Sequence, residues 1–217
     1  MIELYRRIAL IISPLVISLG IFILFQTKRN YQEIQCRSRT TSAVCFLYHE
    51  TYVGITAYSA YFSTWPFFGE TILIDLHLFF FSLGSFICLI AIIMYIFYLF
   101  NMESFLRAVG RTPDKLITDG IFNKSRNPQS LARAIGLISL GIWGRSFYAL
   151  FLAVIWISLN HPYILIEEKF LEMHFGEDYL EYCISTPRYF SLLNPLKRII
   201  KINGILGNKY EQGLYQK

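Results

Sequence analysis

Two adjacent carboxylates, Glu167 and Glu168, follow an apolar run at the point where the chain is expected to leave a membrane. Acids are unusual at such a depth, and they could bind a cationic group or accept a proton. On a helix, Glu168 falls within an apolar stripe, whereas Glu167 lies about 100° away. We therefore predict that one acid of the pair faces packed protein or a cavity. The rest of the stripe comprises Ile164, Leu171, Phe175, Tyr179 and Tyr182.

The acidic pair also has a local explanation. Proline is a typical first residue of a helix, and Pro162 precedes the pair by about one turn. The positive end of a helix dipole stabilises acids in the first turn. The pair by itself leaves both explanations open.

The composition indicates an integral membrane protein. Of 217 residues, 54% are hydrophobic and only 16% are charged, and the mean hydropathy is +0.43. A soluble domain of this length is less apolar. Because basic residues flank the apolar runs, the net charge of +5 indicates membrane topology and contact with anionic lipid, without nucleic acid.

The four cysteines do not indicate a metal site. They show no CxxC spacing and no paired histidines accompany them, so we predict no bound metal. Cys36 and Cys45 could pair if their loop faces an oxidising compartment.

Apolar runs predict an all-α integral membrane fold with about four transmembrane helices. Residues 8–26 form an uncleaved first span, and a second lies within residues 71–100. Residues 27–50 are expected to be a loop. Residues 51–68 are rich in Tyr, Thr and Ser, which favours an interfacial or re-entrant piece over a span. Residues 101–130 form the densest basic segment, which the positive-inside rule places in the cytoplasm.

Two short apolar runs, residues 131–143 and 147–160, predict a tight helical hairpin that returns to the cytoplasmic side. Arg133, near its start, is expected to snorkel to the surface, with a functional role as the alternative. Two spans before the basic segment put the N-terminus in the cytoplasm too, in agreement with Arg6 and Arg7. Residues 191–217 are expected to be an amphipathic cytoplasmic tail.

A hairpin brings its ends close, so the basic loop and the acidic helix meet on one face of the membrane. The loop reads Thr-x-Gly-x-aromatic-x-x-x-Arg-x-Pro over residues 118–128, and the helix reads Glu-Glu-x-x-Leu-x-x-x-Phe-Gly-x-x-Tyr-x-x-Tyr over residues 167–182, followed by Pro187-Arg188. Taken singly, Asp119-Gly120 is an ordinary turn and Asn127-Pro128 an ordinary helix start.

In order and spacing, these two segments resemble the isoprenylcysteine carboxyl methyltransferase and phospholipid methyltransferase superfamily. The resemblance covers roughly residues 112–190, and it implies an integral membrane enzyme that uses S-adenosylmethionine. Its cofactor pocket would face the cytoplasm, with a lateral opening for a lipid-like or isoprenylated substrate. Three regions follow: N-terminal helices and a loop (1–110), a cofactor-binding region with the hairpin (111–190), and the tail (191–217).

The resemblance also implies the site residues. The cofactor contacts would be Lys115, Leu116, Ile117, Phe122, Asn127, Pro128, Gln129, Ser130, Glu167 and Glu168; the catalytic candidates are Glu168, Arg126, His161 and Tyr163. The sequence departs from the family motif, since Asn127 replaces a His and Ser130 a Tyr. Tyr163 also stands where the isoprenylcysteine branch has an Arg that holds the substrate carboxylate.

The residues suit this cofactor chemically. Backbone amides near Pro128 could hold its carboxylate, and either glutamate could bind its ammonium or ribose. There is no Gly-rich dinucleotide fingerprint, so the pocket is not expected to be of Rossmann type. An amine acceptor would need a proton acceptor, for which Glu168, His161 and Tyr163 are candidates.

Several functions remain open at this stage. The first is a methyltransferase for a lipid-like acceptor, similar to isoprenylcysteine carboxyl methyltransferases, and the second is a phospholipid N-methyltransferase. An NADPH-dependent reductase of the sterol type and a non-catalytic membrane protein are the others. The expected location is a bacterial inner membrane or the endoplasmic reticulum, in a multi-pass arrangement with both termini cytoplasmic.

Overall fold

The computed structural model describes residues 2–33, 39–62, 64–66, 74–102 and 115–190. Within these ranges the regular elements are helices, and one isolated bridge joins Pro66 to Ser146. The helices are α1 (Ile2–Glu33), α2 (Arg39–Tyr61), α3 (Ile74–Asn101), the short 3-10 helix η1 (Gly120–Asn123), α5 (Pro128–Trp143), α6 (Phe147–Phe175) and α7 (Glu177–Ser185).

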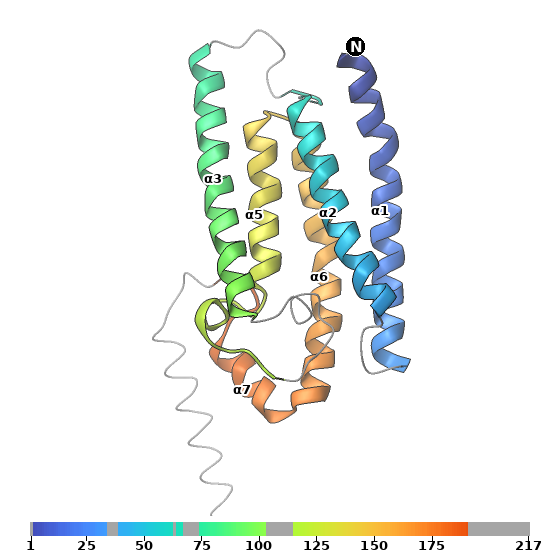
Figure 1. The fold of residues 1–217 in the computed structure, drawn as a ribbon, viewed down its shortest axis with the longest axis vertical. Coiled ribbons are helices and arrows are strands. Elements are labelled where there is room, and N and C mark those ends of the chain that lie inside the picture. Colours follow the sequence, from blue (N-terminus) through green and yellow to red (C-terminus); the bar gives the residue numbers. More distant parts are fainter. Residues whose placement is uncertain (1, 34–38, 63, 67–73, 103–114, 191–217) are drawn as a thin grey trace, which may run out of the picture.

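Five of the helices, α1, α2, α3, α5 and α6, run along a common direction as a bundle (Figure 1). Helix α5 contacts α3, α6 and α2, and α6 also contacts α1 and α2. Helices η1 and α7 lie together at one end of the bundle, which we call the loop end (Figure 1). The turn between α5 and α6 lies at the other end, which we call the far end.

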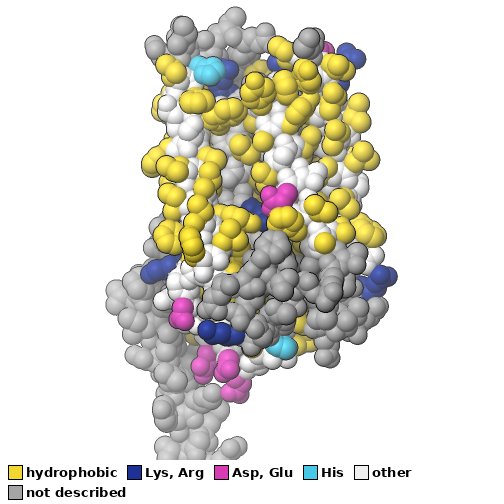
Figure 2. Space-filling view, viewed as in Figure 1, with side chains coloured by type: hydrophobic (Ala, Val, Ile, Leu, Met, Phe, Trp, Pro, Cys, Tyr) yellow, Lys and Arg dark blue, Asp and Glu magenta, His cyan; other side chains and the backbone are white. Residues whose placement is uncertain are grey.

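Three of the described helices are long and apolar enough to cross a membrane: Ile2–Arg29, Leu76–Asn101 and Phe147–Phe175. Figure 2 shows a broad band of hydrophobic side chains across the face in view, with most of the charged side chains on that face near its two ends. The predicted all-α integral membrane fold is confirmed.

The predicted hairpin is present, but its second arm is longer than expected. Helix α5 ends at Trp143, and α6 begins at Phe147 with the Ser146 side chain accepting from the Ala149 backbone N–H at 3.1 Å. The suggestion that Pro162 starts a helix is wrong, because α6 runs through Pro162 to Phe175. Buried membrane helices tolerate an internal proline because neighbouring groups satisfy the freed backbone carbonyl.

The acidic helix ends earlier than its apolar stripe. Gly176 adopts a φ of +57°, which stops α6 and starts α7. Tyr179 and Tyr182 therefore lie on α7, yet both side chains are buried as the stripe predicts.

Helix α2 corrects two predictions. Its 23 residues occupy part of the expected loop at 27–50 and most of the piece at 51–68 that was expected to be interfacial or re-entrant. Two of its polar side chains lie inside the bundle: Tyr52 and Thr56 are fully buried, with Tyr52 donating to the Leu152 carbonyl at 2.9 Å and Thr56 to the Tyr52 carbonyl at 2.8 Å. A helix face that packs inside a bundle can carry polar side chains when they are hydrogen-bonded there.

The presence of α2 also changes the expected placement of the N-terminus. The predicted arrangement put the N-terminus on the same side as the basic segment 101–130. Because α1, α2 and α3 each run the length of the bundle, the start of α1 lies at the far end and η1 at the loop end (Figure 1). The described helices thus place the start of α1 and η1 at opposite ends of the bundle (Figure 1), whereas the prediction put them on one side; the side of the membrane on which each lies stays a prediction. The tail at 191–217 lies outside the described residues.

Helices α3 and α5 approach each other closely at a glycine. A Cβ atom on Gly84 would come within 2.6 Å of the Trp143 backbone, so this crossing requires a residue without a side chain. The contact brings α3 against the C-terminal end of α5.

Candidate functional site

Glu168 is buried at the loop end and is held by three side chains. Its Oε1 accepts from Asn127 Nδ2 at 3.2 Å and lies 3.4 Å from Arg126 Nη2. Its Oε2 accepts from Arg188 Nε at 2.9 Å and lies 2.8 Å from Arg188 Nη2. We call these four residues the Glu168 cluster. The prediction that one acid of the pair faces packed protein is confirmed for Glu168.

Backbone contacts bring the two chain segments of the cluster together. The Arg126 N–H donates to the Pro187 carbonyl at 2.9 Å, and Asn127 Nδ2 donates to the Arg188 carbonyl at 3.2 Å. Ser125 Oγ donates to the same Arg188 carbonyl at 3.3 Å. Asn127 is the N-cap residue of α5, but its side chain serves the cluster and does not cap the helix. The two halves of the sequence motif thus meet at Glu168.

The charge of Glu168 shifts the proton affinities of its neighbours. Its hydrogen bond with Arg188 raises the pKa of that guanidinium. Burial, together with the negative charge of Glu168, raises the pKa of Tyr179 well above its usual value. Both shifts favour a charged guanidinium at Arg188 and a neutral phenol at Tyr179 beside the Glu168 cluster.

An aromatic cluster lies beside the Glu168 cluster and contains several predicted cofactor contacts. Leu116 and Ile117 pack against the buried side chains of Phe122 and Tyr182, and the Tyr182 hydroxyl donates to the Phe122 carbonyl at 2.8 Å. Lys115 stands exposed at the start of this segment. Gly120, with a φ of +59°, allows the chain to turn into η1.

The remaining predicted cofactor contacts lie in the first turn of α5, where they point to different faces of the helix. Pro128 is buried at the helix start, and Ser130 is half-buried. Gln129 points away from Glu168: its amide, oriented to satisfy both ends, donates to the Tyr98 hydroxyl at 3.1 Å and accepts from Arg133 Nη1 at 2.8 Å.

The catalytic candidates on α6 do not converge on one point. His161 is exposed, and its Nδ1 lies 2.7 Å from the hydroxyl of Tyr189, next to Arg188 in the chain. Glu167 is half-buried. Tyr163, five residues before Glu168, is turned about 140° around the helix from it. Arg126 is the candidate that contacts Glu168 directly.

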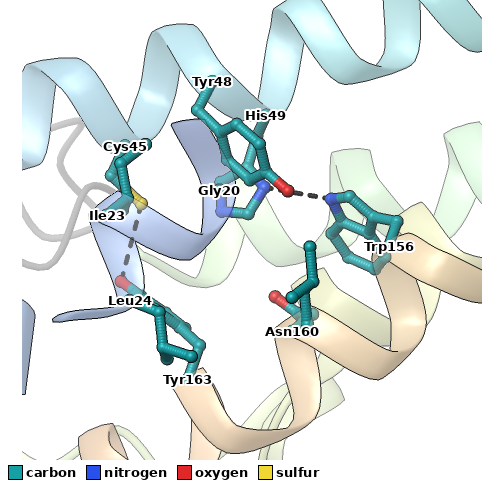
Figure 3. A pocket seen from close by; sticks show the side chains of 10 residues that line it. Gly20, Ile23, Leu24, Cys45, Tyr48, His49, Trp156, Asn160 and Tyr163 are labelled. Carbon is teal, nitrogen blue, oxygen red and sulfur yellow. Dashed lines mark hydrogen bonds between the residues drawn. The ribbon is translucent and has the colours of Figure 1, made fainter. Parts of the chain in front are cut away.

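Tyr163 instead lines a small pocket between α1, α2 and α6 (Figure 3). Its hydroxyl lies 3.7 Å from Cys45 Sγ, and Trp156 Nε1 donates to His49 Nδ1 at 3.2 Å. The cavity volume of this pocket is about 20 Å³, far below the roughly 300 Å³ of the smallest small-molecule sites. The suggested partner of Cys45, Cys36, lies outside the described residues.

Two features of the loop end fit the carboxylate of an S-adenosylmethionine cofactor. The buried Nε of Arg126 has no hydrogen-bond partner within the described residues. The first backbone N–H groups of α5 lie beside it, with no side-chain cap from Asn127. In the described part of the chain, no three His, Cys, Asp or Glu residues gather as a metal site would require.

The chain matches one known family. The model of the phospholipid methyltransferase family, which is part of the integral membrane methyltransferase superfamily, matches residues 76–178. The match runs from α3 through the hairpin and into α7. No curated protein and no solved structure matches the chain.

Sequence reasoning included Pro187-Arg188 in the motif but gave Arg188 no role. The structure shows that Arg188 makes the shortest contact to Glu168. Two features of the sequence could have indicated this contact: Arg188 follows the acidic helix directly, and the acids of that helix had no assigned basic partner. Sequence reasoning also missed Tyr98, which contacts Gln129, and Glu50, which contacts Arg133.

Proposed function

We propose that the protein is a membrane methyltransferase that uses S-adenosylmethionine and transfers a methyl group to a lipid-like acceptor. The observation that carries this proposal is the Glu168 cluster, which joins both halves of the motif at one end of a membrane bundle. The family match supports the same reaction class. The acceptor is either a carboxylate of the isoprenylcysteine type or a phospholipid amine, and the family match favours the amine.

We assign the binding of the cofactor to residues around the cluster. Arg126 Nε and the start of α5 would hold its carboxylate, and Glu167 its ammonium. Leu116, Ile117 and Phe122 would offer an apolar wall to the adenine. Glu168 is a positioning residue, because both of its oxygens are engaged by guanidinium groups.

When bound, the cofactor supplies an electrophilic methyl group on a sulfonium. Transfer requires the acceptor to approach in line with the breaking carbon–sulfur bond, so the protein mainly aligns the reactants and excludes water. A carboxylate acceptor needs no base. With an amine acceptor, His161 is the better placed proton acceptor, since Glu168 is engaged and Tyr163 faces the other side of α6.

Calorimetric titration of purified protein in detergent tests this proposal. We expect micromolar binding of S-adenosylmethionine and S-adenosylhomocysteine, loss of binding in Glu167→Gln, and no change in Glu172→Gln, an exposed acid on the same helix. Tighter binding of NADPH would indicate a reductase of related fold. Absence of binding for both methyl cofactors would contradict the proposal and favour a non-catalytic protein.

A further inference from the structure

A second charged pair lies within the hydrophobic band, away from the Glu168 cluster. Arg133 Nη2 is 3.4 Å from Glu50 Oε1 and donates to the Tyr95 hydroxyl at 3.0 Å. The guanidinium also lies over the Tyr95 ring, 5.2 Å from its centroid. Only 9% of the Arg133 side chain is exposed, so Arg133 does not snorkel to the surface.

The Glu50 side chain is half-exposed on the outer surface of the hydrophobic band. Its side chain is 49% exposed, and Leu47, one turn earlier on α2, is 62% exposed. On α3, Ile96 beside Tyr95 is also exposed. Figure 2 shows acidic and basic side chains together inside the hydrophobic band. The carboxylate therefore lies where the protein meets lipid, and its Oε2 has no partner in the part of the chain that the structure describes.

Stability does not explain such a pair. An ion pair with a half-exposed partner, as Glu50 is here, typically contributes little to the free energy of unfolding. Ionisable side chains at membrane depth are unfavourable, and they commonly mark ligand pathways. A half-exposed carboxylate in this band therefore indicates a ligand that brings a positive charge.

Polar contacts connect this pair with the proposed cofactor site. Gln129, one turn before Arg133 on α5, accepts from Arg133 Nη1 at 2.8 Å and donates to the Tyr98 hydroxyl at 3.1 Å. The Tyr98 ring lies 6.0 Å from that of Phe122, a proposed cofactor contact. The contacts thus run from the lipid-facing side of the bundle to the loop end.

We propose that Glu50 and Arg133 form a binding site for the zwitterionic headgroup of a membrane amphiphile, with its ammonium on Glu50 and its anionic group on Arg133. The assignment of this ligand as the methyl acceptor rests on the proposed function. Binding exchanges one ion pair for two and leaves no charge unpaired. An anionic headgroup would take Arg133 and leave Glu50 without a partner, and a cationic one would leave Arg133 buried and unpaired.

Native mass spectrometry of the full chain in detergent tests the site. The protein is mixed with equal amounts of three lipids that have the same acyl chains. They are zwitterionic phosphatidylethanolamine, anionic phosphatidylglycerol and a cationic lipid with a trimethylammonium headgroup and no phosphate. We expect about a tenfold preference for the zwitterion. Glu50→Gln should abolish that preference, and Glu50→Asp should retain it. Glu3→Gln is the matched control, because Glu3 forms an exposed pair with Arg7.

Other outcomes would overturn the inference. If Glu50→Gln lowers thermal stability but keeps the headgroup preference, the pair only joins α2 to α5. If wild type shows no preference, there is no such site. Cofactor titration of the same samples separates the two proposals: we expect Glu50→Gln to bind S-adenosylmethionine normally. Headgroup selectivity in a protein that binds no methyl cofactor would contradict the proposed function alone.

Discussion

Two carboxylates of this protein pair with arginine in opposite surroundings. Glu168 is 11% exposed by side chain and contacts two arginines and an asparagine. Glu50 is 49% exposed and pairs with one arginine inside the hydrophobic band. The first joins α6 to two segments distant in sequence, and its removal would release all of them. The second joins α2 only to Arg133 of α5 and is half-exposed on the surface of the band. The number of side-chain partners therefore distinguishes an acid that holds the fold together from one that is accessible to a ligand.

The largest expected effect is at Glu168. Glu168→Gln leaves Arg126 buried without its counter-charge, so we expect a loss of about 3 kcal/mol in the free energy of unfolding. Binding of S-adenosylmethionine should also be lost. Thermal unfolding in detergent and calorimetry measure the two effects, with exposed Glu172→Gln as control. Unchanged stability would remove the distinction between the two carboxylates.

Gly84→Ala should affect the Glu50 region and spare the Glu168 cluster. The new Cβ would meet the Trp143 backbone at 2.6 Å, which separates α3 from α5 and destabilises the protein by about 2 kcal/mol. Tyr95 on α3 would then move from Arg133, while cofactor binding is retained. Gly54→Ala is the control, since nothing lies within 4 Å of its Cβ, and it should stabilise α2 by about 0.5 kcal/mol. Equal melting temperatures for both variants would contradict a tight α3–α5 contact.

A smaller effect is expected at high pH around the Glu168 cluster. Burial and Glu168 raise the pKa of Tyr179 above its usual 10.0, so the folded protein keeps a proton that the unfolded chain loses. The resulting stability is present below pH 10 and declines as pH rises above it, by up to about 1.4 kcal/mol per pH unit. Tyr179→Phe should flatten this decline in chemical denaturation curves. Parallel curves for wild type and variant would contradict it.

The smallest effect on stability is expected in the hydrophobic band. Replacing both members of the pair, Glu50→Leu with Arg133→Leu, should leave the free energy of unfolding within about 1 kcal/mol of wild type. Thermal unfolding in detergent measures this change. A loss as large as that of Glu168→Gln would mean that the two carboxylates have the same structural role.

Several features could be predicted from local sequence. The burial of Glu168 follows from its place in an apolar stripe, and the hairpin follows from two short apolar runs around Gly144. The roles of Gln129 and Tyr163 could not be read in this way. Helical periodicity tells which residues share a face, but it does not tell which neighbour that face meets. Gln129 therefore turns out to contact Tyr98 and Arg133, and Tyr163 lines the pocket of Figure 3.

The sequence by itself determined the all-α membrane fold, the hairpin, and the meeting of a basic loop with an acidic helix. These depend on hydropathy and helical period, which are local properties. Only the tertiary structure decided that α2 belongs to the bundle, that Arg188 completes the Glu168 cluster, and that Glu50 pairs with Arg133. Hydropathy measures transfer from water to lipid, whereas Tyr52 and Thr56 of α2 donate hydrogen bonds inside the bundle, to carbonyls of α6 and of α2 itself. Ion pairs between distant segments likewise depend on which helices become neighbours.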